Sequence, residues 1–369
     1  MNPLTAESNP ALRNALRAFI CAALLAGGAA NAQTVAANVA VPFYTAGDFM
    51  RGAYRFWYAP QAAAFAEQAG GLPPAISAVC DAGADASASK LEQARERWKA
   101  TALAWDRLSG VQVGPLVQRR STRQIDFTPT RPELIKRAIQ TAPQDAAAME
   151  SIGTPAKGLP ALEWLLWTQA IAPATPACRY AVQVAADIQR EADTLAKAFS
   201  DLAARPPGEG EESNGPAMSE LINQWTGALE RLRWAEMEKP RMAGAAQGGR
   251  NAAPYARSAS GQTAARWAAQ WQALRTLGAA PSQASEAPRP GTALAPIETY
   301  LRGLGRNEPA DKLAQSVGKA DKALQNISPA NRAGITAAGR SLAELKKLTE
   351  AEIAPALEVS IGFSDADGD

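Results

Sequence analysis

Hydrophobic positions along the chain recur at spacings of three and four residues, which is the period of an amphipathic α-helix. The clearest stripe runs through Leu91, Ala94, Trp98, Ala102, Trp105 and Leu108. Further helices are expected over residues 132–141, 180–202, 221–232, 262–277, 293–304, 310–325 and 329–354. No segment alternates convincingly between apolar and polar residues, as a half-buried strand would. The pattern therefore predicts an all-α protein.

Two helix starts carry the signature of a capping box. Ser89 is followed by Glu92, and Thr130 is followed by Glu133, with Pro132 at the first helical position. A serine or threonine at the N-cap and a glutamate three residues later satisfy each other's backbone amides. We expect helices to begin at these two points.

The stretch 206–216 (PPGEGEESNGP) contains no hydrophobic side chain of the aliphatic or aromatic kind and predicts a linker. It would separate two helical bundles at 33–205 and 217–369, because a chain of this length exceeds what one hydrophobic core usually organises. Two further loops are expected at 239–259 and 278–291, which are rich in Gly, Ala, Ser and Pro. We find no clear internal repeat that would relate the two bundles by duplication.

Residues 1–32 have the pattern of a cleavable secretory signal. Arg13 and Arg17 form its basic end, residues 18–30 its apolar run, and Ala30-Asn31-Ala32 a small-residue cleavage site. Cys21 stands too close to Arg17 to leave the apolar run that lipoprotein processing needs. No later stretch approaches the ~20 apolar residues of a membrane-spanning helix. Export to the periplasm, with cleavage after Ala32, is the expectation.

The composition limits the classes of possible partner and predicts the redox state of the cysteines. The net charge is +2 for the whole chain, which gives no support to nucleic-acid binding. Beyond the signal two cysteines are left, Cys80 and Cys178, and in an oxidising compartment they are expected to form a disulfide. A bridge that closes a loop of about 100 residues stabilises a fold by ~4.7 kcal/mol in the chain-entropy description. Two buried free thiols are the alternative.

The segment 158–167 (GLPALEWLLW) places a carboxylate on an apolar helical face. With Pro160 as the first helical residue, Glu163 falls on one stripe with Leu159, Leu162, Leu166 and Trp167. A carboxylate that faces a core needs a charged, hydrogen-bonding or metal partner, or it takes up a proton. Glu163 is therefore a candidate site residue, and a purely structural ion pair with an arginine is the alternative.

A second candidate region is rich in arginine and has little helical character. Asp126 lies there between Ile125 and Phe127, with Arg123 and Arg131 nearby. Planar guanidinium groups suit carboxylates, so one of these arginines is a natural partner for Glu163 or for an anionic ligand. A solvated basic loop is the other interpretation.

Several of these segments resemble the imelysin-like proteins, the M75 peptidase family of bacterial envelopes. Gly158 and Glu163 are in register with its G-x-H-x-x-E signature, but Pro160 stands in the place of the histidine. Residues 105–116, 123–131 and 361–369 are also similar to the predicted-lipoprotein branch of the family. The resemblance implies an all-helical, two-domain periplasmic protein with a site where the domains meet. Members are named as peptidases or linked to iron uptake, so envelope iron-uptake components are the partners that it implies.

The resemblance also selects further site residues. It implies that Asp126 and Arg123 lie near Glu163. In the segment 255–261, Arg257 and Ser258 match an Arg-Ser pair that precedes a helix in the family. A serine there often only caps the helix, but a helix N-terminus can also bind an anion.

The chain contains no histidine, and this limits its chemistry. Catalytic zinc normally takes histidine-rich ligands, so zinc is disfavoured, whereas carboxylates such as Glu163 suit iron or calcium. The leading hypothesis is a periplasmic binding or accessory protein that is linked to iron or other metal handling, with a pocket between the domains around Glu163. The alternatives are a peptidase that works without histidine and a structural partner protein with a vestigial site.

Overall fold

A computed structural model describes the protein over residues 40–83, 86–246, 255–281 and 286–362. In these ranges all regular structure is helical and there is no strand, which confirms the prediction of an all-α fold. The predicted signal at 1–32 lies outside the described residues.

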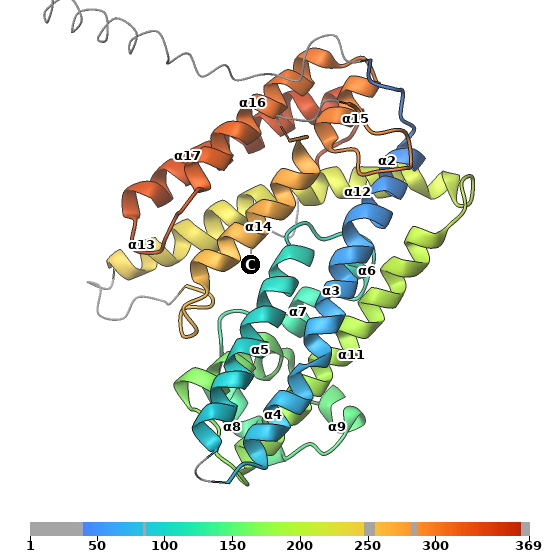
Figure 1. Ribbon diagram of the computed structural model, residues 1–369. Helices are drawn as coiled ribbons and strands as arrows, with labels where there is room; N and C mark the ends of the chain where they lie inside the picture. Colours follow the sequence, from blue (N-terminus) through green and yellow to red (C-terminus); the bar gives the residue numbers. More distant parts are fainter. Residues whose placement is uncertain (1–39, 84–85, 247–254, 282–285, 363–369) are drawn as a thin grey trace, which may run out of the picture.

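The helices fall into two groups that follow one another along the chain (Figure 1). The N-terminal half contains α2 (Ala46–Ala53), η1 (Tyr54–Tyr58), α3 (Ala59–Gly70), α4 (Leu72–Cys80), α5 (Ser87–Leu108), α6 (Pro115–Gln118), α7 (Ser121–Ile125), α8 (Pro132–Thr141), α9 (Ala146–Glu150), η2 (Thr154–Ala156), α10 (Gly158–Glu163), η3 (Trp164–Thr168) and α11 (Pro176–Ala204). The C-terminal half contains α12 (Glu211–Glu230), η4 (Arg231–Glu238), α13 (Lys239–Ala246), α14 (Thr263–Gly278), α15 (Ile297–Gly303), α16 (Asn307–Leu324), α17 (Arg332–Leu348), η5 (Thr349–Ile353) and α18 (Ala354–Ala356).

The N-terminal half is a bundle built around the long helix α11. Helix α11 packs against α3 and α4, and α5 packs against the same two helices from another side. The apolar stripe of α5 faces this core, with Trp98 and Trp105 fully buried. This burial of large aromatic surface is the main force that holds α5 in place.

The C-terminal half lies across one end of this bundle (Figure 1). Helix α16 packs on α17 and α14, and α12 packs on α17. The halves are joined by the packing of α14 on α5 and of α12 on α2. Phe49 of α2 also stacks on Tyr300 of α15, with ring centroids 4.6 Å apart.

Several predicted helix boundaries were wrong. Helix α5 begins at Ser87, before the predicted cap at Ser89. Helix α8 spans Pro132–Thr141 as predicted, but its N-cap is Arg131, whose side chain makes no cap, and the predicted capping box of Thr130 is not formed. Helix α12 begins at Glu211, inside the segment that was predicted to be a linker, and it contains Pro216 in its first turns. The predicted loop at 239–259 starts as helix α13, because α12, η4 and α13 follow one another without a break and η4 packs against α17.

Cys80 and Cys178 form a disulfide, with Cα atoms 5.5 Å apart. It joins the end of α4 to the first turn of α11, so both ends of the bridge lie within the N-terminal half. The bridge fixes the two helices at the end of the bundle farthest from the C-terminal half (Figure 1).

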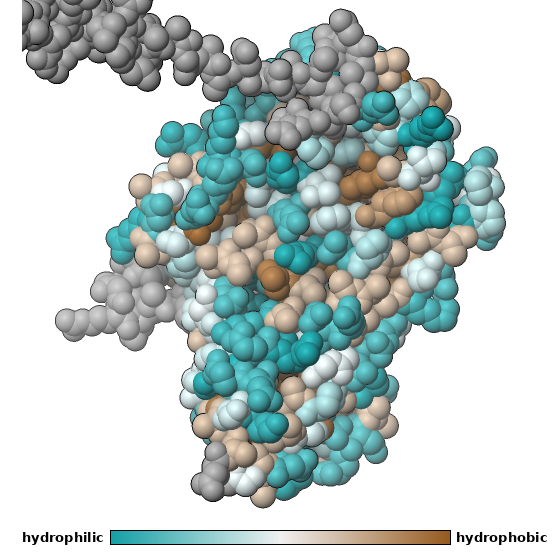
Figure 2. Space-filling model, in the orientation of Figure 1, coloured by the Kyte–Doolittle hydropathy of each residue, from teal (hydrophilic) through white to brown (hydrophobic). Residues whose placement is uncertain are grey.

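The face of the molecule in Figure 2 is covered mainly by hydrophilic side chains, and its hydrophobic residues form small separate patches. Most of the large apolar side chains of the described residues are instead buried in one core cluster that includes residues of both halves. None of the described helices is long and apolar enough to span a membrane.

Candidate functional site

Glu163 ends the short helix α10, and its position depends on Gly158 at the start of that helix. Gly158 has a φ of 77°, and a Cβ atom there would lie 2.5 Å from the carbonyl oxygen of Ile125. Only glycine permits both the conformation and the approach. Gly158 therefore lets α10 pack directly against the segment that ends in Asp126.

Pro160 is the third residue of α10, not the first as predicted. A proline is still tolerated in the first turn, because its missing N–H would have no partner within the helix. The indole of Trp98 donates to the carbonyl oxygen of Leu159 over 3.1 Å and fixes this turn against α5. The Glu163 side chain, only 7 % exposed, points away from the solvent at the junction of the two halves.

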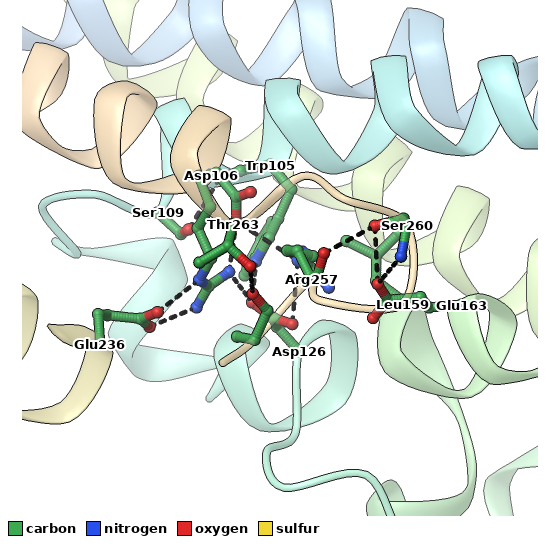
Figure 3. A network of polar contacts seen from close by, with 12 residues as sticks. Trp105, Asp106, Ser109, Asp126, Leu159, Glu163, Glu236, Arg257, Ser260 and Thr263 are labelled. Atoms are coloured by element: carbon green, nitrogen blue, oxygen red, sulfur yellow. Dashed lines mark hydrogen bonds and ion pairs between the residues drawn. The ribbon is translucent and has the colours of Figure 1, made fainter. Parts of the chain in front are cut away.

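The partner of Glu163 is a serine from the C-terminal half. Ser260 donates two hydrogen bonds to Oε1 of Glu163, one from its backbone N–H over 2.9 Å and one from its hydroxyl over 2.7 Å (Figure 3). Such hydrogen bonds to a carboxylate satisfy part of the charge that burial would otherwise leave unpaired. The loop before α14 is in this way attached to α10.

Arg257 stands beside this pair in an uncommon backbone conformation. Its φ is 64°, which costs free energy for a residue with a side chain, and the residue as a whole is only 2 % exposed. Nη2 lies 3.0 Å from Asp126 and 3.3 Å from Asp106. The guanidinium also stacks over the ring of Trp98 at 5.3 Å from its centroid.

Arg266 of α14 is the second cation at this junction. Its Nη1 donates to Asp106 of α5 and, over 2.7 Å, to Asp126. Its Nε and Nη2 donate to the two oxygens of Glu236 over 2.8 and 2.7 Å, a bidentate pair. We call the residues Asp106, Asp126, Glu163, Glu236, Arg257, Ser260 and Arg266 the seam, since they join the two halves (Figure 3).

The charges of the seam shift one another's protonation. Burial alone would raise the pKa of Asp126, but Arg257 and Arg266 together lower it. Burial would also raise the pKa of Glu236, and the charge and hydrogen bonds of Arg266 lower it. For Asp106 burial dominates over the two guanidinium groups and raises the pKa. Asp126 and Glu236 are therefore the ionised partners of the two arginines at neutral pH.

The structure brings three of the candidate residues together and leaves three apart. Glu163, Asp126 and Arg257 all belong to the seam. Arg123, Arg131 and Ser258 are exposed, and they share none of its contacts. Sequence reasoning missed Asp106, Glu236, Ser260 and Arg266.

Most carboxylate oxygen atoms of the seam already accept hydrogen bonds or form ion pairs. Among the described residues no group of three or more His, Cys, Asp and Glu side chains could hold a metal ion. Two cavities, of about 370 and 620 Å³, open elsewhere on the molecule, and Glu163 lines neither. The carboxylates of Asp126 and Glu236 face guanidinium groups, so a bare metal ion would have to displace an arginine to reach them.

The seam should make the free energy of unfolding depend on pH. The pKa values of Asp126 and Glu236 are lowered in the folded state. Both carboxylates therefore stabilise the fold at pH values above their pKa in the unfolded chain, near 4, and this stabilisation is lost as the pH falls. Asp106 opposes the loss, because its pKa is raised. We expect the free energy of unfolding, measured with urea, to fall between pH 5 and pH 3 by less in Glu236→Gln than in the wild type.

The matched control is Glu133→Gln, because the Glu133 side chain is 78 % exposed and pairs only with Lys136. This control should lose stability on acidification as the wild type does. The same loss in all three proteins would show that Glu236 does not titrate as the seam geometry requires.

A family model and solved structures match this chain. The family model described as Imelysin (peptidase M75) matches residues 58–356. The structure of an imelysin-like protein from Psychrobacter arcticum 273-4 superposes with a TM-score of 0.68 at 17% identity, over 88% of this chain and 100% of that one. A protein assigned as an iron-regulated protein A precursor from Parabacteroides distasonis ATCC 8503 superposes with a TM-score of 0.65 at 13% identity, over 85% and 94%. A search among curated proteins finds no match.

Proposed function

The chain belongs to the imelysin family, and on that premise we propose that it is a periplasmic binding or accessory protein for the handling of iron or another metal. The iron link is supported by the iron-regulated protein A precursor, which shares its fold. The signal pattern of residues 1–32 supports the periplasmic location.

The observation that carries the proposal is that Glu163 forms hydrogen bonds across the junction of the two halves. The carboxylate comes from α10 of the N-terminal half, and its donor Ser260 comes from the loop before α14. A ligand or partner that takes the place of Ser260 on Glu163 would therefore change the contact between the halves. Ligand sites commonly lie at such junctions.

The side chains of the seam favour the binding of iron as an anionic complex over the binding of a bare iron ion. Guanidinium groups already neutralise Asp126 and Glu236, and the Nε of Arg257 is buried without a hydrogen-bond partner among the described residues. A free guanidinium N–H suits a carboxylate oxygen of an organic chelator. The proposed cargo is thus an iron complex whose ligands carry carboxylate groups.

A peptidase is the second candidate, because the hydroxyl of Ser260 lies 2.7 Å from a buried carboxylate. A nucleophile next to a general base is the usual arrangement of covalent catalysis. Against it, the N–H of Ser260 donates to Glu163 and is not free to stabilise an oxyanion. The third candidate, a structural protein with a vestigial site, would suit a seam of apolar side chains, whereas this seam is made of charged and hydroxyl groups.

Calorimetric titration of the purified protein tests the proposal, with ferric citrate and with Fe³⁺ buffered by nitrilotriacetate as probes. We expect ferric citrate to bind, and we expect its affinity to fall about tenfold or more in Glu163→Gln and in Arg257→Gln, because each change removes a charged hydrogen-bonding group. Arg131→Gln, which changes an exposed arginine outside the seam, is the control and should bind as the wild type does.

The absence of binding to both probes, or equal binding by all variants, would remove the seam as the site. Incubation with an unfolded protein substrate, with and without a chelator, separates the peptidase from the binding protein. Cleavage that persists in the chelator and is lost in Glu163→Gln would establish the peptidase instead.

A further inference from the structure

A groove of about 620 Å³ opens between the two halves, away from the seam. It lies where the C-terminal end of α11 approaches the first turns of α12, close to α6 (Figure 1). Its walls come from η1, α6 and α11 of the N-terminal half and from α12 of the C-terminal half. Its volume is within the range of small-molecule sites, which are commonly formed between domains.

One wall of the groove is Tyr54, the first residue of the π-helical turn η1. Single π-helical turns within α-helices are frequent at functional sites. The ring is held by Tyr58 and Phe199, at centroid distances of 6.2 and 6.5 Å. Its hydroxyl donates to no acceptor among the described residues, whereas Tyr58 donates to the carbonyl oxygen of Val111.

A carboxylate is fixed on the α12 wall of the groove, beside Gly114. Gly114, with a φ of 50°, donates its N–H over 2.9 Å to Oε2 of Glu220 on α12. A side chain at position 114 would rarely adopt this conformation, and its Cβ would lie 3.9 Å from the Tyr54 hydroxyl. The other oxygen of Glu220 accepts no hydrogen bond from the described part of the chain, so it is available to a donor in the groove.

The groove also holds a cation without a carboxylate partner. Arg205 follows the last turn of α11 and lines the groove, and it forms no ion pair within the described residues. The second acid of the lining, Asp201, is paired with Lys197 over 2.7 Å. Arg205 and Glu220 are therefore the two free charges of the groove, and they are of opposite sign.

The remaining lining complements these two charges. Burial and the Glu220 carboxylate raise the pKa of Tyr54 to about 12, against the effect of Arg205, so its hydroxyl stays protonated and can donate at neutral pH. Gln118 adds a carboxamide, and Leu202 with Ala198 adds an apolar wall. The groove thus offers an acceptor for an ammonium group, donors for a carboxylate, and apolar surface between them.

We propose that this groove binds a small zwitterion with an ammonium group and a carboxylate, such as a free amino acid or a short peptide with free ends. Glu220 receives the ammonium group, Arg205 and the Tyr54 hydroxyl receive the carboxylate, and Leu202 contacts the apolar part. The groove shares no residue with the seam, so this site does not depend on the function proposed for Glu163.

Calorimetric titration of the purified protein with L-leucine, trialanine and acetylated, amidated trialanine tests the site. We expect at least one of the two free zwitterions to bind and the blocked peptide to bind at least about tenfold more weakly, because it lacks both charges. Binding of leucine alone would assign the site to amino acids, and stronger binding of trialanine would assign it to peptides. No binding by either zwitterion, or equal binding of the blocked peptide, would overturn the proposal.

Two variants locate the binding in the groove. Arg205→Gln removes the free cation at an exposed position, and Ala198→Trp fills the groove while it keeps every charge. Each should weaken binding about tenfold or more, whereas Glu133→Gln on the exposed face of α8 should leave it unchanged. Undiminished binding in both groove variants would contradict the assignment.

Discussion

Arg266→Gln should lower the free energy of unfolding by about 3–5 kcal/mol, which is the usual cost of removing one partner of a buried ion pair. Arg266 is the only residue of the seam that contacts Asp106, Asp126 and Glu236 together. Without it, the single guanidinium of Arg257 faces Asp106 and Asp126, and Glu236 loses both of its hydrogen bonds. Repulsion between buried carboxylates adds to the loss.

Urea unfolding at pH 7 measures this effect, and Arg275→Gln is the matched control. Arg275 lies on the same helix α14 and pairs with Asp321, but its side chain is 44 % exposed. An exposed pair contributes only about 0–1 kcal/mol. A loss in Arg266→Gln that is no larger than the loss in Arg275→Gln would show that the seam does not hold the two halves together.

The fold could be predicted because helical periodicity is a local signal. The stripe of Leu221, Ile222, Trp225 and Leu229 is visible in the sequence, and all four side chains are buried in α12. The ends of the helices were harder to predict. Helix α13 forms within a segment rich in glycine and alanine, because it continues a helix that packs against α17, and such tertiary contacts override local preference.

The candidate site could be predicted only in part. Glu163 could be identified from the sequence because it is a single carboxylate in an otherwise apolar stripe. The same signal existed for Arg266, which lies between Thr263 and Gln270 on the buried face of α14 beside Trp267. Asp106 next to Trp105 is a similar case. Polar residues at helical spacing within a tryptophan-rich stripe would therefore have revealed more of the seam.

Other residues could not be placed without coordinates. Ser258 and Ser260 are two positions apart, and only the turn that includes Arg257 at a φ of 64° decides which hydroxyl reaches Glu163. The abundance of arginine near Asp126 suggested that one of these arginines pairs with Glu163, but the donor to Glu163 is Ser260. Both cations on Asp126 come from more than 100 residues farther along the chain. Pairings of that kind depend on how the two halves dock.

The central claim is that Glu163 connects the two halves through Ser260. The hydroxyl of Ser260 donates to a carboxylate that is 7 % exposed, so the bond is charge-assisted and poorly replaced by water. A hydrogen bond to a charged group contributes about 1.5–3 kcal/mol. The backbone N–H of Ser260 keeps its own bond in a serine-to-alanine variant, so the coupling reports the hydroxyl alone.

A double-mutant cycle in urea unfolding at pH 7 tests this claim most directly, with Glu163→Ala, Ser260→Ala and the double variant. The account predicts a coupling of about 1.5 kcal/mol or more between the two positions, and a coupling below about 0.5 kcal/mol between Glu163→Ala and Ser258→Ala, since Ser258 is exposed. A coupling between Glu163 and Ser260 as small as that of the Ser258 control would contradict it.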